Sequence, residues 1–316
     1  MYSKVLNIVI IGTGGIGIRH IEGLLSIPKD FHLNFFISDL KTSALNFAKE
    51  LIKKDRNDSE IFPFSELDEI KKNMDLIIIA TTSYPRLDIL KSILEKKIKG
   101  FIILEKLLAP NYKIFNEYLK YNSENQLSSR IYVNQWYHST SVFNCIYKNS
   151  PYPKNIFLKG NGWGMACNSV HYISLFEKLF DTEFKFLDSH LEVLESKRNS
   201  YKELIGTIIL KSNKDINMTI SCNNNNDKNK LRRISIFTDK KKFLYNYDGR
   251  ILFDKENLTS YNMPYLSSFL KNVYSKNKVL KNLMNNFLPI KDSIRNHKCF
   301  FEALKNSSIN DSNYFT

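Results

Sequence analysis

The stretch VLNIVIIGTGGIGIRHIEGLL, Val5–Leu25, decides how the first part of this chain folds. It opens with a short apolar run rich in β-branched residues, which is typical of a buried parallel strand. From Ile18 onward its apolar residues recur at helical spacing. Between the two patterns stands GTGGIG, which places Gly12, Gly14 and Gly17 in the register G-x-G-x-x-G. The stretch therefore predicts a strand, a glycine turn and a helix, in that order.

Each glycine of this turn has a physical task at a dinucleotide-binding site. The first permits the tight turn, the second lets a pyrophosphate approach the backbone, and the third lets helix and strand pack closely. The unpaired N–H groups at the start of the helix then face the phosphates. A glycine turn that merely packs is the plain alternative. A further strand pattern, LNFFISD, ends in Asp39 about 20 residues after the last glycine, as a dinucleotide site requires, so we expect such a site here.

The carboxylate of Asp39 bears on the choice between NAD and NADP. It is placed to accept hydrogen bonds from both ribose hydroxyls and to repel a 2′-phosphate, which favours NAD. Lys41, two residues on, would neutralise a phosphate, so NADP stays open. In this part of the chain we expect the cofactor to contact Gly12, Thr13, Gly14, Gly15, Ile16, Gly17 and Asp39.

The order of strand and helix patterns predicts two domains. They alternate over about the first 110 residues, which indicates βαβ units in a parallel sheet. Strand patterns separated by short polar turns then follow, as in an antiparallel sheet. The predicted fold class is α/β, with a Rossmann doubly wound parallel sheet in residues 1–120 and an α+β domain with an open, mostly antiparallel sheet in residues 121–316. Helical patterns close the chain at about 265–286 and 290–304, and residues 223–230 predict a mobile hairpin loop.

Charge and composition narrow the classes of function. The chain has 316 residues and a formal net charge of +14. Such a charge is typical of proteins that bind nucleic acid, an anionic membrane or an anionic small substrate. Its lysines are scattered, and no zinc finger, helix-turn-helix or RNA-binding motif accompanies them. We therefore expect a solvated basic surface and no nucleic-acid partner.

The remaining bulk features point to a chain of the reducing cytoplasm. No apolar run is long enough to span a bilayer, so no membrane partner is expected. The four cysteines show no CxxC spacing, which predicts reduced thiols and no metal site. The open antiparallel sheet leaves a face that the chain's own helices or a second subunit must cover, so we expect a homo-oligomer built through the C-terminal sheet.

Two later stretches, IIIATTSYPRLDILKSIL and GFIILEKLLAP, follow the glycine turn in an order that resembles the Gfo/Idh/MocA oxidoreductases, the glucose–fructose oxidoreductase and inositol dehydrogenase family. The residues that match that family's strand-end motifs are Ala80, Thr81, Glu105 and Lys106. In NGWGMACNSVHYISLFEKLF, His171 matches the histidine of its second signature, a helix with an Asp four residues before a His. The resemblance covers essentially the whole chain.

The sequence departs from the family pattern at several positions. Thr82 stands where the family usually has Pro, and Arg86 stands where its helix usually has His. Leu107 replaces the Pro after Glu-Lys, and Cys167 occupies the usual Asp position, with Asn168 beside it. A proton relay assisted by a carboxylate therefore does not carry over to this chain.

The resemblance implies hydride transfer between a nicotinamide and a carbon of a sugar or cyclitol. Lys106 is then expected to orient the reacting oxygen and to stabilise developing negative charge, and His171 to act as the acid/base. Asn168 is expected to hold substrate or to tune the imidazole, because an amide donates and accepts hydrogen bonds well. We expect cofactor contacts also from Thr81, Thr82, Glu105 and Lys106, and substrate contacts from Cys167, Trp163 and Arg86.

Each residue has a plainer reading as well. In this reading Lys106 and Arg86 are surface charges, Cys167 is a small packed thiol, and Trp163 is an aromatic ring of the core. His20, on the first helix, is expected to pack. The favoured function is an oxidoreductase acting on a nucleotide-linked or amino sugar of surface-polysaccharide synthesis, with reduction of an imine or a tetrapyrrole as a variant. The alternative is a non-catalytic dinucleotide-binding sensor or partner protein on the same fold.

Overall fold

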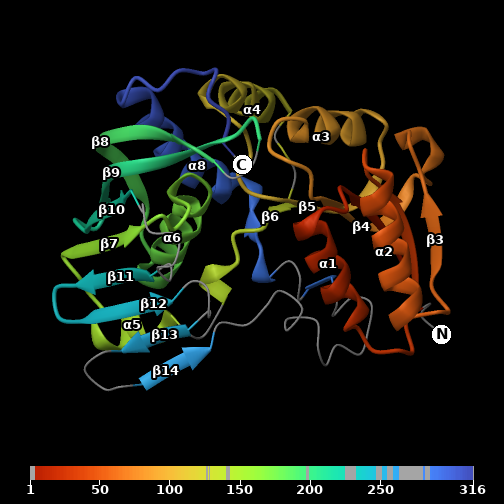
Figure 1. The fold of residues 1–316 in the computed structure, drawn as a ribbon, viewed down its shortest axis with the longest axis horizontal. Coiled ribbons are helices and arrows are strands. Elements are labelled where there is room, and N and C mark those ends of the chain that lie inside the picture. Colours follow the sequence, from red (N-terminus) through yellow and green to blue (C-terminus); the bar gives the residue numbers. More distant parts are fainter. Residues whose placement is uncertain are drawn as a thin grey trace. The chain divides into compact units, whose positions relative to one another are not determined.

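The computed structural model describes residues 4–125, 127, 129–139, 143–196, 199–224, 233–246, 251–254, 259–262, 280–281 and 285–315. These residues form two compact units (Figure 1). The first contains the described residues of Met1–Leu108, Asn125–Asn134 and Tyr265–Ile290. The second contains those of Ala109–Glu124, Gln135–Pro264 and Lys291–Thr316.

The first unit is built on a seven-stranded sheet with the order β15-β6-β5-β4-β1-β2-β3. All neighbouring strands run parallel except β15, which pairs antiparallel with β6. The predicted parallel sheet of a Rossmann type is confirmed. The strands are β1 (Val5–Ile11), β2 (His32–Ser38), β3 (Glu60–Pro63), β4 (Asn73–Ile79), β5 (Lys99–Leu104), β6 (Ile131–Val133) and β15 (Leu288–Pro289).

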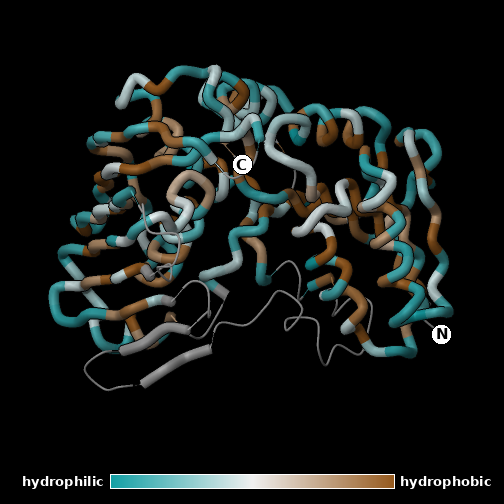
Figure 2. Tube along the Cα trace, in the orientation of Figure 1, coloured by the Kyte–Doolittle hydropathy of each residue, from teal (hydrophilic) through white to brown (hydrophobic). Residues whose placement is uncertain are grey.

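Helices connect the parallel strands of this unit, and their apolar faces cover the sheet. They are α1 (Gly15–Leu25), α2 (Thr42–Asp55) and α3 (Arg86–Glu95), with a short 3-10 turn η1 (Leu67–Glu69). The central strands β1 and β4 are continuously hydrophobic in their carboxyl halves (Figure 2), because both faces of a parallel sheet are buried there. Since the strands are parallel, the carboxyl ends of β1, β4 and β5 meet at one edge of the sheet.

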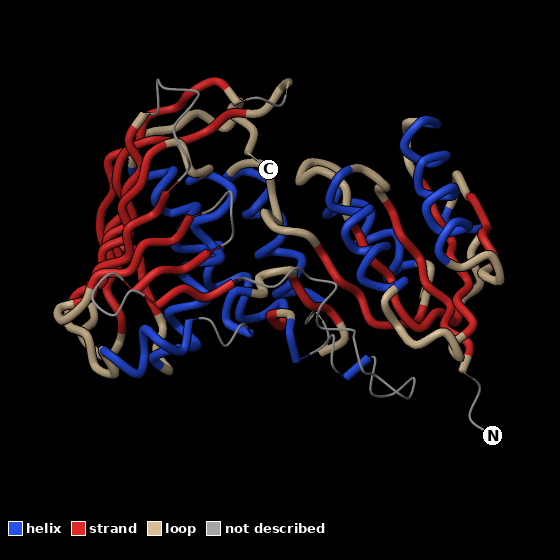
Figure 3. The backbone as a smooth tube through the Cα atoms, turned by 60° about the horizontal axis from the view of Figure 1, so that its bottom comes forward, coloured by secondary structure: helices blue, strands red, loops and turns tan. Residues whose placement is uncertain are grey.

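The second unit is built on an eight-stranded sheet with the order β14-β13-β12-β11-β7-β10-β9-β8. Only β7 and β10 run parallel; the other neighbouring pairs are antiparallel, as the sequence predicts. Figure 3 shows these strands as one layer with helices along one side. The strands are β7 (Asn155–Asn161), β8 (Phe184–Glu195), β9 (Lys202–Ser212), β10 (Asn217–Asn223), β11 (Arg233–Thr238), β12 (Lys242–Asn246), β13 (Ile251–Asp254) and β14 (Thr259–Asn262).

The helices of the second unit come from three separate parts of the chain. They are α4 (Tyr112–Asn125), α5 (Asn144–Asn149), α6 (Met165–Phe180) and α8 (Ile290–Asn306), with the 3-10 turn η2 (Tyr137–Ser139). Helix α4 joins this unit because Phe115 stacks on Phe301 of α8 at 4.5 Å, whereas β6 joins the first unit because it pairs with β5. The sequence-based division at residue 120 differs from these units in those two segments and in the described residues of Tyr265–Ile290, which belong to the first unit.

Two predictions fall largely beyond the structure. Most of the helical pattern at 265–286, and residues 225–230 of the predicted hairpin loop at 223–230, lie outside the described residues. The helical pattern at 290–304 is part of α8. Among the described residues, no helix combines the length and the hydropathy needed to cross a bilayer.

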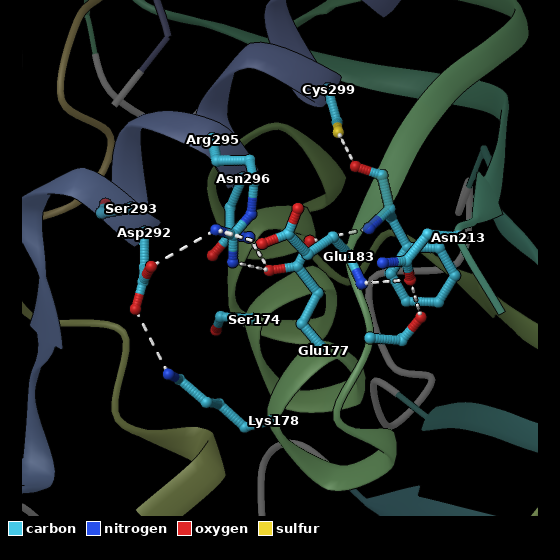
Figure 4. A network of polar contacts seen from close by, with 12 residues as sticks. Ser174, Glu177, Lys178, Glu183, Asn213, Asp292, Ser293, Arg295, Asn296 and Cys299 are labelled. Atoms are coloured by element: carbon cyan, nitrogen blue, oxygen red, sulfur yellow. Dashed lines mark hydrogen bonds and ion pairs between the residues drawn. The ribbon is translucent and has the colours of Figure 1, made fainter.

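Helix α6 is the buried centre of the second unit, and Glu177 fixes it to two other elements (Figure 4). One carboxylate oxygen of Glu177 accepts the backbone N–H of Phe184, at the start of β8, at 2.8 Å. The other accepts from Arg295 at 2.9 Å and from Asn296 at 2.6 Å, both on α8. A single buried carboxylate thus joins α6, α8 and the edge of the sheet.

Removing this carboxylate should destabilise the second unit. We expect Glu177→Ala to lower the free energy of unfolding by about 3 kcal/mol, because breaking a buried charge pair leaves its partners unsatisfied. Urea denaturation at neutral pH measures the change. Lys211→Met is the control, because it breaks an exposed pair with Asp215 and should cost less than about 0.5 kcal/mol. Equal shifts for the two variants would contradict the assignment of Glu177 as the anchor.

Candidate active site

The glycine turn between β1 and α1 packs tightly on one side and is open on the other. Gly12 has a φ of +92°, and a Cβ there would lie 2.9 Å from the carbonyl carbon of Ala80. A Cβ at Gly17 would lie 2.0 Å from the carbonyl oxygen of Gly12. A Cβ at Gly14 would meet nothing within 4 Å. The first and third glycines therefore allow close packing, and the second borders open space.

That open space lies in front of the amino terminus of α1. Gly14 is the N-cap residue, and no side chain caps the helix. Gly14, Gly15 and Ile16 are exposed, and no acidic residue stands in the first turn. The free N–H groups of a helix start attract a pyrophosphate, so this geometry fits the diphosphate of a dinucleotide.

Asp39 stands directly after β2, beside the glycine turn. One of its carboxylate oxygens accepts from the backbone N–H of Thr13 at 2.7 Å and from its hydroxyl at 3.2 Å. The other accepts from the backbone N–H of Lys41 at 2.8 Å. The carboxylate is partly exposed and held in one orientation, as required of a group that binds ribose hydroxyls.

The ends of β4 and β5 supply the other predicted cofactor residues. Thr81 is half-buried and Thr82 is exposed, two and three residues beyond the end of β4. Lys106 is half-buried, two residues beyond the end of β5, and its peptide bond to Leu107 is cis. The structure therefore brings these residues to the same sheet edge as the glycine turn, where ligands of open α/β sheets bind.

Glu105, by contrast, faces the interior of the first unit. Its side chain is only 4% exposed. One of its oxygens accepts from His20 Nε2 at 2.7 Å and from Asn134 Nδ2 at 2.5 Å. Burial alone would raise the pKa of the Glu105 carboxyl, but the His20 and Asn134 hydrogen bonds and the Arg86 charge hold it below its usual value. Glu105 is thus a buried carboxylate stabilised in its charged form.

Arg86, expected to contact substrate, is also buried, with 1% of its surface exposed. Its guanidinium donates to the backbone carbonyls of Thr81 and Leu107. It stands at the first position of α3 and ties together the segments that follow β4 and β5. In this structure its charge is directed at the protein backbone.

In the second unit, the candidate residues gather at the start of α6. Gly164 precedes the helix with a φ of +79°. Asn168 donates from Nδ2 to the carbonyl of Trp163 at 3.0 Å, and the partly exposed thiol of Cys167 lies 3.5 Å from the carbonyl of Gly164. Trp163 is fully buried and donates to the carbonyl of Ser221 at 3.2 Å. Asn168 and Trp163 therefore shape the turn that starts the helix.

His171 lies one turn further along α6 and is held on a flat aromatic surface. Its ring stacks on Tyr137 with centroids 4.4 Å apart and planes 10° apart. Gln135 donates to the carbonyl of the preceding residue, Val170, at 2.7 Å. His171 is 5% exposed. The ring is therefore fixed in plane by packing, which suits a proton-exchanging group.

Three residues at these places, Asn134, Tyr137 and Glu203, were not singled out in the sequence, and His20, which was expected to pack, is hydrogen-bonded to Glu105. His20 and Asn134 bind Glu105, Tyr137 stacks on His171, and Glu203 of β9 accepts the N–H of Ala166 at 2.7 Å in the first turn of α6. Asn134 follows β6 directly, and that position is the sequence signal that could have found it. No sequence signal marked Glu203, because it stands inside a strand pattern far from α6 along the chain.

The first unit is thus a dinucleotide-binding domain, defined by the glycine turn, the open helix start and the acidic end of β2. No three or more His, Cys, Asp or Glu side chains gather as a metal site in the part of the chain that the structure describes.

Comparison with protein families gives the particular class. Residues 6–132 match the profile described as the oxidoreductase family with an NAD-binding Rossmann fold, Gfo/Idh/MocA. These residues therefore resemble the NAD-binding domain of the Gfo/Idh/MocA oxidoreductases, a family whose description names NAD as the cofactor.

Solved structures share the fold over nearly the full chain. UDP-N-acetylglucosamine 3-dehydrogenase from Acidithiobacillus ferrooxidans has a TM-score of 0.65 at 12% identity, covering 98% of each chain. Biliverdin reductase from Synechocystis, in complex with biliverdin and NADP+, has a TM-score of 0.65 at 14% identity, and the match covers 95% of this chain and 98% of that one. Scyllo-inositol dehydrogenase from Lactobacillus casei, with NAD(H) and scyllo-inositol, has a TM-score of 0.63 at 12% identity, and the match covers 96% of each chain. No curated protein matches the sequence. One fold thus carries three substrate chemistries.

The two glycine positions should respond differently to a methyl group. Gly14→Ala should leave the melting temperature unchanged but raise the Kd for NAD by about 10-fold, since its Cβ enters the space in front of the helix start. Gly17→Ala should lower both stability and binding, because its Cβ collides with the Gly12 carbonyl. Calorimetric titration and thermal unfolding measure both. An unchanged Kd in Gly14→Ala would place the phosphates elsewhere.

Asp39 should set the preference between the two dinucleotides. Asp39→Ala should weaken NAD binding and relax discrimination against NADP, because the carboxylate that repels a 2′-phosphate is gone. The ratio of the two Kd values, compared with the wild type, measures this. If the wild type already prefers NADP, Lys41 matters more than Asp39.

Proposed function

We propose that this oxidoreductase transfers a hydride between the nicotinamide and a hydroxyl-bearing carbon of a sugar, in particular a nucleotide-linked or amino sugar. The observation that carries the proposal is the position of Lys106, a half-buried ammonium group beyond the end of β5, at the dinucleotide-binding edge. The fold shared with a UDP-N-acetylglucosamine dehydrogenase and an inositol dehydrogenase supports this substrate class.

The bound nicotinamide accepts or returns the hydride. The residues of the chain then have to orient the carbon and handle the hydroxyl proton. Lys106 donates a hydrogen bond to the reacting oxygen and stabilises its negative charge as the C–H bond breaks. His171 accepts the hydroxyl proton on oxidation, so that the alcohol becomes a ketone, and returns it on reduction. Tyr137 keeps the imidazole in plane during this exchange.

The start of α6 supplies the remaining substrate contacts in this proposal. Cys167, with a partly exposed thiol, and the amide of Asn168 stand on the helix turn before His171. Trp163 is directed into the protein and supports the start of α6. Arg86 is also directed inward and supports the segments that follow β4 and β5. The net charge of +14 favours an anionic substrate, such as a sugar linked to a phosphate.

Surface-polysaccharide synthesis in the cytoplasm is the setting that we propose. All four cysteines are free thiols, as expected in a reducing compartment. We also propose a homo-oligomer through the sheet of the second unit, where Phe157 on β7 and Leu187 on β8 are exposed. Size-exclusion chromatography with light scattering tests the oligomer, and a monomeric wild type would exclude it.

A non-catalytic dinucleotide-binding protein is the second candidate. It is favoured by one observation: the first turn of α6 carries no acidic residue, so no carboxylate of that helix turn assists His171.

Turnover distinguishes the two candidates. Purified protein with NAD and a panel of UDP-sugars, amino sugars and inositols should show substrate-dependent absorbance of reduced nicotinamide. Lys106→Met and His171→Asn should each lower kcat/KM by about 100-fold or more, the range of a lost acid/base or electrostatic group.

Lys99→Met is the matched control, because Lys99 is exposed at the amino end of the same strand and should leave turnover unchanged. Cofactor binding without turnover on any member of the panel, and no effect of Lys106→Met beyond binding, would favour the sensor.

A further inference from the structure

Two buried charges in the first unit lie on either side of Lys106, and neither transfers a proton or contacts the reacting oxygen in the chemistry proposed above. Glu105 precedes it and Arg86 binds the carbonyl of Leu107, which follows it. Both side chains are almost wholly buried, at 4% and 1% exposure. A buried charge is costly unless it is well paired, so such groups hold their surroundings to one arrangement when all their partners are in place.

Arg86 fixes the carboxyl side of Lys106. Its guanidinium donates to the carbonyl of Leu107, immediately after the lysine, and to the carbonyl of Thr81, after β4. The planar fork of an arginine sets the direction of two acceptors at once. The segment carrying Lys106 is therefore tied to the neighbouring strand end, at the edge where the cofactor binds.

Glu105 fixes the amino side of Lys106. Its carboxylate accepts from His20, on the helix that begins at the glycine turn, and from Asn134, immediately after β6. Its backbone N–H donates to the carbonyl of Ile79, the last residue of β4, at 3.1 Å. The residue before the lysine is thereby joined to α1 and to the strands on both sides of β5.

We propose that Arg86 and Glu105 are positioning residues for Lys106: they set the direction of its ammonium group at the dinucleotide-binding edge. This deepens the proposed function, on which it rests, and replaces the expectation that Arg86 contacts substrate. The two acceptors, the carbonyls of Thr81 and Leu107, also explain why residue 86 is an arginine. A lysine at 86 makes one point contact and cannot orient both carbonyls.

The same unit contains an arginine that serves as a matched control. Arg130 donates to the carbonyls of Ile98 and Gly100, at 3.0 and 2.7 Å, near the amino end of β5. It is partly buried, like Arg86 it bridges two backbone carbonyls, and it lies at the opposite end of the strand. Loss of Arg130 removes a comparable backbone clamp without touching the segment of Lys106.

A double-mutant cycle tests whether Arg86 acts through Lys106. Arg86→Met should lower kcat about 10-fold to 100-fold on the substrate found in the panel, with a smaller change in the Kd for NAD. In a Lys106→Met background the same change should lower kcat less than 2-fold, because the group it positions is gone. Arg86→Lys should recover only part of the loss. Arg130→Met should lower stability but leave kcat within 2-fold.

The position of the Lys106 side chain can also be followed by NMR without a substrate. Reductive methylation with ¹³C-formaldehyde labels the lysines, and the Lys106 signal is the one missing from Lys106→Arg. Arg86→Met and Glu105→Gln should each shift or broaden that signal in the NAD complex, whereas Arg130→Met should leave it in place. This readout requires only folded protein, which thermal unfolding verifies for each variant.

The outcomes separate the inference from the function on which it rests. The positioning role would be overturned if Arg86→Met lowered kcat by the same factor in the Lys106→Met background as in the wild type. It would also be overturned if the Lys106 signal stayed unmoved in Arg86→Met and Glu105→Gln. Normal turnover by Lys106→Met would overturn the proposed function, while a shifted signal would still support the positioning of the lysine.

Discussion

The site of the first unit depends on one close approach, that of α1 to the end of β1. A Cβ at Gly17 would lie 2.0 Å from the carbonyl oxygen of Gly12, so the helix can approach the end of the strand this closely only because Gly17 has no side chain. The approach brings the open start of α1 to the edge where β4 and β5 end. Without it, the N–H groups of the helix would not face the space beside Gly14, and the phosphate site that we propose there would be lost.

The strand ends around that edge are organised by buried charge. Glu105 and Arg86 bind groups on α1, β4, the segment after β5 and the residue after β6, and so make the edge one connected structure. The candidate residues of the second unit are organised differently. There the α6 turn is shaped by hydrogen bonds from Asn168 and Trp163, by the Glu203 carboxylate that accepts the Ala166 N–H, and by stacking of Tyr137 on His171. Each unit therefore holds its candidate residues by its own internal contacts.

The sequence predicted the features that local patterns encode. The strand–turn–helix of Val5–Leu25, the parallel sheet and the antiparallel sheet follow from periodicity and glycine spacing, and all are present. Asp39 was located because its distance from the glycines is a local property. The direction in which a side chain points was harder to predict. Glu105, Arg86 and Trp163 look like ligand contacts in the sequence but turn inward, because the partners that bury them come from distant segments.

The central claim is that a nicotinamide dinucleotide binds at the edge formed by the glycine turn, Asp39 and Lys106. A crystal structure of the protein with NAD tests it most directly. The account predicts the pyrophosphate over the N–H groups of Gly15 and Ile16, the adenosine ribose on Asp39, and Nζ of Lys106 within hydrogen-bonding reach of a substrate oxygen beside nicotinamide C4. A cofactor bound with its nicotinamide remote from Lys106, or with its phosphates away from the start of α1, would contradict it.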